Sequence, residues 1–477
     1  MNKKIIKNLF SLSFAELIVR IFSFLLTVYI ARVFGTSTFG KVSFAQVISE
    51  YIGLFIVFGL NTIGVREIAK DKKRTQAIVT QIFSVKLLLF FIGILFIVFF
   101  VIIGDFKPEQ SMLVVLYGLS AALLALLDFS WIFNGHSMMN YTGLLRILQQ
   151  ALYFICTAVM LLYIKDIVLF PVSMIISIIL TGLVGLILCN LKINEFSLNQ
   201  LFYNKRNRSL LKNNHLLKSA IYVFLSTLMV KLYYNFDTIV LKIYNYNDEV
   251  IGLYNAGYKI ILLLTTFSSI IVSVVFPLLS KGSKNHKKIV NNTLKYLLIF
   301  IIPIIIGGQV VAKDLLVFIY GIDFALAANS FRILLIALFF IYINYLFGHV
   351  LLTINNEKKY TLYVFLGAIF NVVCNFIFVP KYGVVAASMT TVGAEIIVFA
   401  GYISILLKEQ LINMKVNWFF KFIICLVLFL VLVYVTSQLL NVILTIIISI
   451  VVYIILIFVF KVIVLKDFIG RKGVNRD

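Results

Sequence analysis

Residues 87–103, LLLFFIGILFIVFFVII, form an unbroken run of apolar residues without a charge. The run lies in a longer segment, 78–104, which is long enough to cross about 30 Å of hydrocarbon as a helix. In lipid the backbone must satisfy its own hydrogen bonds, so a long, non-alternating apolar run is a helix rather than a barrel strand. Comparable spans recur at 10–32, 40–62, 110–133, 141–164, 167–190, 216–243, 250–279, 290–312, 328–353, 360–379, 384–407, 417–437 and 440–464. The sequence therefore predicts an all-α integral membrane protein of about fourteen transmembrane helices.

The overall composition supports the membrane prediction. Hydrophobic residues make up 62% of the chain and charged residues 13%, whereas soluble domains contain about 45–50% and about 25%. The mean hydropathy is +1.07.

The placement of Lys and Arg predicts the orientation, because cytoplasmic loops retain these residues. About 27 of the 42 lie at the termini and in the even-numbered connections, and only about 7 lie in the odd-numbered ones. We therefore expect both termini in the cytoplasm. The net charge of +23 then needs no nucleic-acid partner, because the basic residues are divided among short loops.

The spans fall into two halves and a tail. The polar segment 191–215, a predicted cytoplasmic linker, separates an N-terminal six-helix lobe, 1–190, from a C-terminal six-helix lobe, 216–407. Two additional helices and a cytoplasmic tail occupy 408–477. The segments RVFGTSTFGKVSFA (32–45) and IYNYNDEVIGLYNA (243–256) align Gly40 with Gly252 at an offset of 212, and a second pair, starting at 140 and 359, aligns at an offset of 219. These similarities predict two lobes related by pseudo-symmetry, with a substrate site between them; chance similarity between apolar, low-complexity segments is the alternative.

Charged residues inside the spans are candidates for that site, because a charge at mid-bilayer costs about 2.5–3.5 kcal/mol on insertion scales. Arg20 and Lys231 lie near the middle of the first and seventh spans at an offset of 211, which matches the repeat. Polar residues at helical spacing accompany them and predict a polar central cavity, with interhelical hydrogen bonding as the alternative. The predicted pyrophosphate-binding residues of this cavity are Arg20, Lys231, Lys259, Arg146 and Arg332. Arg146 and Arg332 lie nearer to span ends, where snorkelling is an alternative.

Buried acids form a second group, assigned to cavity lining or ion coupling: Glu16, Glu50, Asp128, Asp237 and Glu395. Glu16 precedes Arg20 by one helical turn and could pair with it. Charge-balancing structural pairs are the alternative to coupling.

Metal and nucleotide chemistry are not expected. The four cysteines and four histidines are scattered without ligand spacing, and there is no phosphate-binding glycine loop. We expect no cofactor and no enzymatic activity.

Three segments resemble a known family: ARVFGTSTFGKVSFA (31–45), FGLNTIGVREIAK (58–70) and FNGHSMMNYTGLLRI (133–147). They resemble the polysaccharide biosynthesis proteins that flip lipid-linked oligosaccharide repeat units, within the multidrug/oligosaccharidyl-lipid/polysaccharide exporter superfamily. The resemblance covers essentially the whole chain.

The resemblance implies a flippase of the bacterial cytoplasmic membrane. Its substrate would be an undecaprenyl-pyrophosphate-linked oligosaccharide, moved by alternating access for O-antigen or capsule synthesis. Membrane lipids, and a polysaccharide polymerase with export machinery, would be its partners.

Two other functions remain as alternatives. A multidrug exporter of the same superfamily would be expected to have a net acidic cavity for organic cations, whereas this one offers both signs. A membrane glycosyltransferase or polymerase would carry a large outer loop or acids in the first outer loop, and here that loop, 35–40, has no acid.

Overall fold

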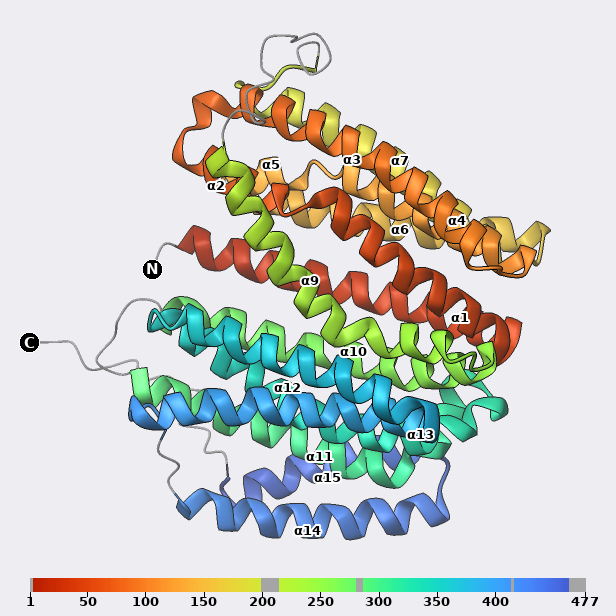
Figure 1. Cartoon of the computed structure of the whole chain (residues 1–477). Coiled ribbons are helices and arrows are strands. Elements are labelled where there is room, and N and C mark those ends of the chain that lie inside the picture. The colour runs from red at the N-terminus through yellow and green to blue at the C-terminus, as the bar shows by residue number, and fades with distance from the viewer. Residues whose placement is uncertain (1–2, 199–213, 280–285, 413–415, 463–477) are drawn as a thin grey trace, which may run out of the picture.

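Helices make up all the regular structure in the described part of the chain, residues 3–198, 214–279, 286–412 and 416–462 of a computed structural model (Figure 1). Eleven of these helices are long and apolar enough to cross a membrane. The predicted all-α membrane fold is confirmed, because no strand occurs within these ranges.

The described residues contain fourteen segments long enough to cross a membrane when the long helices are divided at their kinks. Helix α1 divides at Gly35 (φ 77°) and helix α13 at Gly383 (φ 56°), so each contains two crossings. Helix α9 adds a further one, because its 30 residues span about 45 Å. Both glycines lie in the left-handed region, which residues with a Cβ adopt only at a steric cost. The predicted short outer loop at 35–40 is therefore reduced to one residue, with helix on both sides.

The first group of helices comprises α1 (Lys3–Val57), α2 (Leu60–Lys70), α3 (Thr75–Ile103), α4 (Pro108–Leu127), α5 (Ser130–Gly135), α6 (Met139–Tyr163) and α7 (Leu169–Lys192). The second group comprises α9 (Asn214–Ile243), α10 (Asp248–Leu279), α11 (His286–Tyr320), α12 (Ala328–Thr353) and α13 (Glu357–Lys408). Helices α14 (Val416–Leu439) and α15 (Val442–Val459) follow and pack on α11 (Figure 1). We call the first two groups the N-lobe and the C-lobe. Most of the predicted linker, residues 199–213, lies outside the described residues.

Two predicted spans contain a break in the helix. The predicted span 110–133 contains a break at Asp128, whose carboxylate accepts a hydrogen bond from the Ser130 amide at 2.9 Å where the short helix α5 begins. The predicted span 40–62 ends at Val57, where Gly59 (φ 72°) turns the chain into α2. Both breaks occur within apolar sequence, so run length alone does not locate them.

The lobes meet along α1 and α10. Gly40 of α1 lies directly against the backbone of Asp248 and Gly252, and a Cβ at Gly40 would overlap the carbonyl of Asp248. The two glycines aligned by the internal repeat are therefore in contact at the lobe interface. Arg32 reinforces this region by donating a hydrogen bond to the Ile319 carbonyl of α11 at 2.8 Å. We call this end of the molecule, where α1 turns at Gly35, the Gly35 end.

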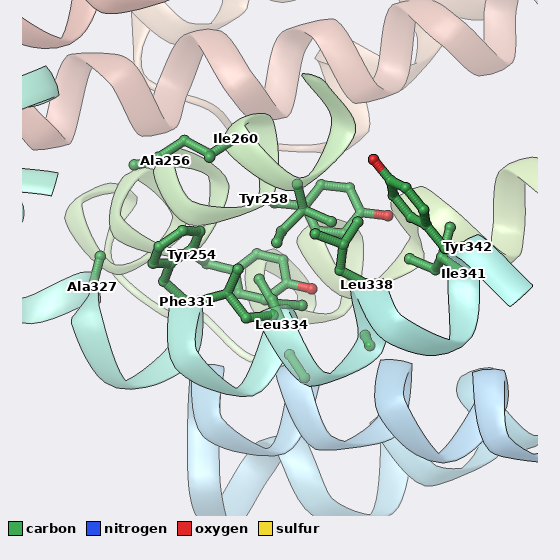
Figure 2. Close-up of a cluster of buried hydrophobic side chains, with 14 of the residues drawn as sticks. Tyr254, Ala256, Tyr258, Ile260, Ala327, Phe331, Leu334, Leu338, Ile341 and Tyr342 are labelled. Atoms are coloured by element: carbon green, nitrogen blue, oxygen red, sulfur yellow. The ribbon is translucent and has the colours of Figure 1, made fainter. Parts of the chain in front are cut away.

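The C-lobe core holds α10 firmly against α12. Figure 2 shows Tyr254 and Tyr258 of α10 among the side chains of Phe331, Leu334 and Leu338 of α12. The hydroxyl of Tyr342 in α12 also donates to the Leu264 carbonyl of α10 at 2.6 Å. These contacts fix the rotation of α10 relative to α12.

Candidate functional site

Two adjoining cavities lie between the lobes. The larger, of about 520 Å³, is lined by residues of α1, α6, α9, α10 and α12. The smaller, of about 260 Å³, lies between α1, α6, α7 and α10. Both are lined by Arg20 and Glu50, so together they form one central site.

The N-lobe side of the site carries a three-residue charge cluster. Glu16 accepts from Arg20 Nε at 3.3 Å and from Arg146 Nη1 at 3.0 Å. Arg20 lies one turn after Glu16 on α1, whereas Arg146 comes from α6. All three side chains are between about one third and one half exposed, so both arginines can reach a ligand in the cavity.

A second cluster connects the two lobes. Lys231 of α9 pairs with Glu50 of α1, and the same carboxylate accepts from Asn235 Nδ2 at 2.7 Å. Lys259 of α10 donates to Gln46 Oε1 of α1 at 3.1 Å. A ligand that binds either lysine must therefore compete with an inter-lobe contact.

The α10 and α12 side of the larger cavity is chemically different, whereas α9 of the same lobe contributes Lys231. We call this side the hydroxyl wall; it consists of Thr265, Thr266 and Ser269 of α10 with Tyr234 of α9, Tyr258 of α10 and Tyr345 of α12. The three α10 hydroxyls were not among the predicted site residues, although their spacing of three and four residues marks one helix face.

Four of the five predicted cationic residues thus line the central site, and Arg332 lies elsewhere. It occupies the first turns of α12 and donates to the Gln309 carbonyl of α11 at 3.0 Å and to Asn329 Oδ1 at 3.3 Å. In this position its guanidinium joins α11 to α12 and contributes to neither central cavity.

The fold places the predicted acidic residues at separate locations. Glu16 and Glu50 line the central site. Asp128 lines a separate cavity of about 220 Å³ inside the N-lobe, which Arg146 and Gln149 also reach. Glu395 is buried in the C-lobe, where it accepts from Asn344 Nδ2 at 2.7 Å.

Asp237 is completely buried within the C-lobe, away from the central site. Its carboxylate accepts from Tyr254, from Asn375 at 2.6 Å, from Thr391 at 2.9 Å and from Asn371 at 3.4 Å. The described residues contain no cluster of three or more His, Cys, Asp or Glu with metal-ligand geometry. The carboxylate of Asp237 and the hydroxyls of Tyr254 and Thr391 nevertheless offer oxygen ligands of the kind that hard cations use, whereas Asn371 and Asn375 turn their N–H groups to the carboxylate.

The arrangement can bind an anion by exchange of partners. The cations in the central site already hold carboxylates or an amide, so they are kept in place without an external ligand. An incoming phosphate can replace Glu16 at the two arginines, where a planar guanidinium binds two oxygens at once. The neighbouring hydroxyl wall can bind uncharged polar groups at the same time.

The chain matches a family model and is similar to two curated proteins over part of its length. A family model described as polysaccharide biosynthesis protein matches residues 5–283. An uncharacterized membrane protein of Methanocaldococcus jannaschii is 25% identical over 169 residues, covering 34% of this chain and 33% of that protein. A probable low-salt glycan biosynthesis flippase of Haloferax volcanii, Agl15, is 20% identical over 176 residues, covering 35% of this chain and 37% of that protein. The matched region thus spans about one third of each of these curated relatives.

Solved structures share the fold over most of the chain. Lipid II flippase MurJ in an inward closed conformation has a TM-score of 0.79 at 19% identity, covering 96% of this chain and 99% of that one. An inward-facing multidrug resistance transporter of the MATE family has a TM-score of 0.64 at 13% identity, covering 82% and 95%. A transporter of the same superfamily from Pyrococcus furiosus has a TM-score of 0.58 at 14% identity, covering 85% and 96%. At these identities the likeness shows the fold alone.

Proposed function

The chain belongs to the polysaccharide biosynthesis protein family, and from this premise we propose that it is a flippase for lipid-linked oligosaccharides. It is a multi-pass membrane protein with the fold of the multidrug/oligosaccharidyl-lipid/polysaccharide exporter superfamily. The relatives named as flippases support the proposed transport activity. Lipid-linked glycans and membrane lipids would then be its partners.

The observation that carries the proposal is the cationic group between the lobes. Arg20, Arg146, Lys231 and Lys259 all reach the central site from four different helices. A diphosphate that links lipid to sugar carries about two negative charges, and its transfer through hydrocarbon would be very costly without compensating charges. A cationic site within the membrane replaces the lost water and lowers this cost.

The proposal includes a substrate and a direction of transport. The substrate is an undecaprenyl-pyrophosphate-linked repeat unit, moved from the inner to the outer leaflet of a bacterial cytoplasmic membrane for O-antigen or capsule synthesis. Both termini lie in the cytoplasm, and a polymerase with export machinery receives the product. The chain performs no covalent chemistry and transports by alternating the access of its two lobes.

Coupling to an ion gradient is assigned to Asp237. The supporting observation is its complete burial among oxygen-bearing side chains of three C-lobe helices, α9, α10 and α13. A cation bound there would alter the packing of α9 against α13 without entering the substrate site. Asp128 and Glu395 remain candidates for the same role.

A multidrug exporter is less well supported by the site. Organic cations need an excess of acids, whereas the two central cavities of the described chain are lined by four cationic and two acidic side chains. The glycosyltransferase alternative gains no support either, because the described part of the central site lacks a cluster of acids for metal-assisted chemistry.

The decisive experiment is a flipping assay with the purified full chain in proteoliposomes that contain a fluorescent undecaprenyl-diphosphate oligosaccharide. Arg20→Ala and Lys231→Ala should each reduce the flipping rate at least tenfold, because each removes a charge that the diphosphate needs. Arg20→Lys should retain part of the rate, since it keeps the charge but loses the planar fork. Lys461→Ala, an exposed position at the end of α15, is the control and should flip normally. Normal flipping by both alanine variants would show that the two charges are structural.

A further inference from the structure

The larger cavity has two sides of different chemistry. Its charged lining residues come from α1, α6 and α9, and include Arg20, Arg146 and Lys231. The positions of α10 and α12 that line the same cavity carry no charged side chain. A ligand that fills the cavity therefore meets charges on one side and the uncharged hydroxyl wall on the other.

The α10 hydroxyls of the wall are prepared to accept hydrogen bonds. Thr265 and Thr266 both donate to the Leu262 carbonyl, at 2.8 and 3.4 Å, and Ser269 donates to the Thr266 carbonyl at 2.7 Å. Each hydroxyl thus uses its single proton within its own helix, while its oxygen lone pairs remain available as acceptors. Sugar hydroxyl groups are the complementary donors.

Aromatic rings complete the wall. Tyr234, Tyr258 and Tyr345 reach the cavity from three different helices. The ring surfaces of Tyr234 and Tyr345 can pack against the C–H faces of pyranose rings, and the hydroxyl ends of the three tyrosines add polar contacts. Tyr258 is held in place by the packing of α10 on α12 (Figure 2).

We propose that the hydroxyl wall is the saccharide subsite and that it selects uncharged sugars. This inference rests on the proposed function and refines its substrate class. The diphosphate binds the cations of α1, α6 and α9, and the first sugars extend along α10 and Tyr345. An anionic sugar at this wall would place a carboxylate beside hydroxyls and tyrosines, because the cations of the larger cavity bind the diphosphate and Lys259 of α10 lines the smaller cavity. The carboxylate would therefore lose hydration without an ionic partner.

The test measures the affinity of the full chain in nanodiscs for three lipids. The first is undecaprenyl diphosphate without sugar, the second carries a neutral disaccharide of one N-acetylhexosamine and one hexose, and the third replaces the hexose with a uronic acid. The wild-type protein should bind the neutral lipid at least tenfold more tightly than the uronic acid lipid. Equal affinity for these two lipids would overturn the selectivity for neutral sugars.

Variants of the wall locate the subsite. Thr265→Val and Ser269→Ala should each weaken binding of the neutral lipid about fivefold, as expected for one lost hydrogen bond, and should leave binding of the sugar-free lipid unchanged. Their hydroxyls donate only within α10, so removing them leaves no donor on another helix unpaired. The matched control is Thr293→Val on α11, whose hydroxyl makes the same kind of bond, to the Ile289 carbonyl at 2.9 Å, outside the cavity.

The outcomes separate the two proposals. A wall variant that weakens binding of the neutral and the sugar-free lipid equally, or weakens neither, overturns the saccharide subsite. The flippase proposal is then still intact. If none of the three lipids binds saturably and Arg20→Ala leaves the flipping rate unchanged, the flippase proposal fails. The proposed saccharide subsite then fails with it. If both wall variants weaken binding of the neutral lipid and leave binding of the sugar-free lipid unchanged, the result supports the saccharide subsite and the flippase proposal.

Discussion

Among single residues, the central charges are stabilised by shared partners. Glu16 serves two arginines, and Glu50 serves Lys231 together with Asn235. Such sharing lowers the cost of placing a charge in the membrane, because a paired charge loses less on leaving water. It also means that an anionic ligand must displace a carboxylate, which links binding to a rearrangement of the site.

In the proposed mechanism, the Glu50 carboxylate competes with the ligand for Lys231. In the Glu50→Gln variant Lys231 loses its competing carboxylate, so the diphosphate lipid should bind about fivefold more tightly, within the range for a partly exposed ion pair. The flipping rate should fall, because the stronger complex releases its ligand more slowly. Both quantities can be measured in the same nanodisc and proteoliposome preparations.

Glu109→Gln is the control for Glu50→Gln, because Glu109 pairs with Lys41 away from both central cavities. It should change neither affinity nor rate. Unchanged affinity in the Glu50 variant would indicate that the carboxylate does not compete with the ligand.

Among the helices, glycine determines how closely the lobes approach. The Gly40 and Gly252 contact brings the backbones of α1 and α10 together, and any side chain at either position would collide with a carbonyl of the other helix. Close helix packing in membranes commonly depends on such small residues. The contact lies at the Gly35 end, so the observed arrangement has the lobes joined there.

The Gly40→Ala variant should separate the lobes at the Gly35 end. Overpacking of this kind costs about 1–3 kcal/mol, so backbone hydrogen exchange in residues 36–42 and 248–254 should accelerate about tenfold. Gly53→Ala on the same helix is the matched control, because a Cβ there would meet Ala121 at an ordinary 3.6 Å. If exchange in Gly40→Ala equals that of Gly53→Ala, the glycine contact does not hold this end closed.

In the molecule as a whole, the helix order places the basic connections at one end. Helix α3 runs from Thr75 to Ile103, so Lys72 and Lys107 lie at opposite ends of the bundle. Lys287, at the start of α11, and Asp248, at the start of α10, are likewise separated by the length of α10. The proposed orientation puts Lys72 and Lys287 in the cytoplasm.

Cysteine labelling tests this orientation. In a cysteine-free background and intact cells, cysteines near positions 107 and 248 should react with an impermeant maleimide, whereas those near 72, 206 and 287 should react only after permeabilisation. Position 206 lies outside the described residues and tests the linker directly. The reverse labelling pattern would invert the topology.

The class of fold could be predicted from the length of the apolar runs. Runs of about twenty residues leave the helix as the only conformation that satisfies the backbone in lipid, so the all-α fold and the fourteen crossings follow from run length. Mid-span charges such as Arg20 and Lys231 contrast with an apolar background, so they could be identified as candidate site residues. The breaks at Asp128 and Gly59 could not, because a single charged residue or glycine within a long apolar run does not by itself show that the helix ends there.

Which polar groups meet depends on the tertiary packing. Arg146 reaches Glu16 across 130 residues and Lys231 reaches Glu50 across 181, whereas Arg332 turns to α11 instead. A membrane helix is apolar on its lipid-facing and protein-facing sides alike, so the pattern of hydrophobicity does not reveal which face turns inward. The rotation of α10 is set by its packing on α12, and this packing directs Thr265 and Ser269 into the cavity.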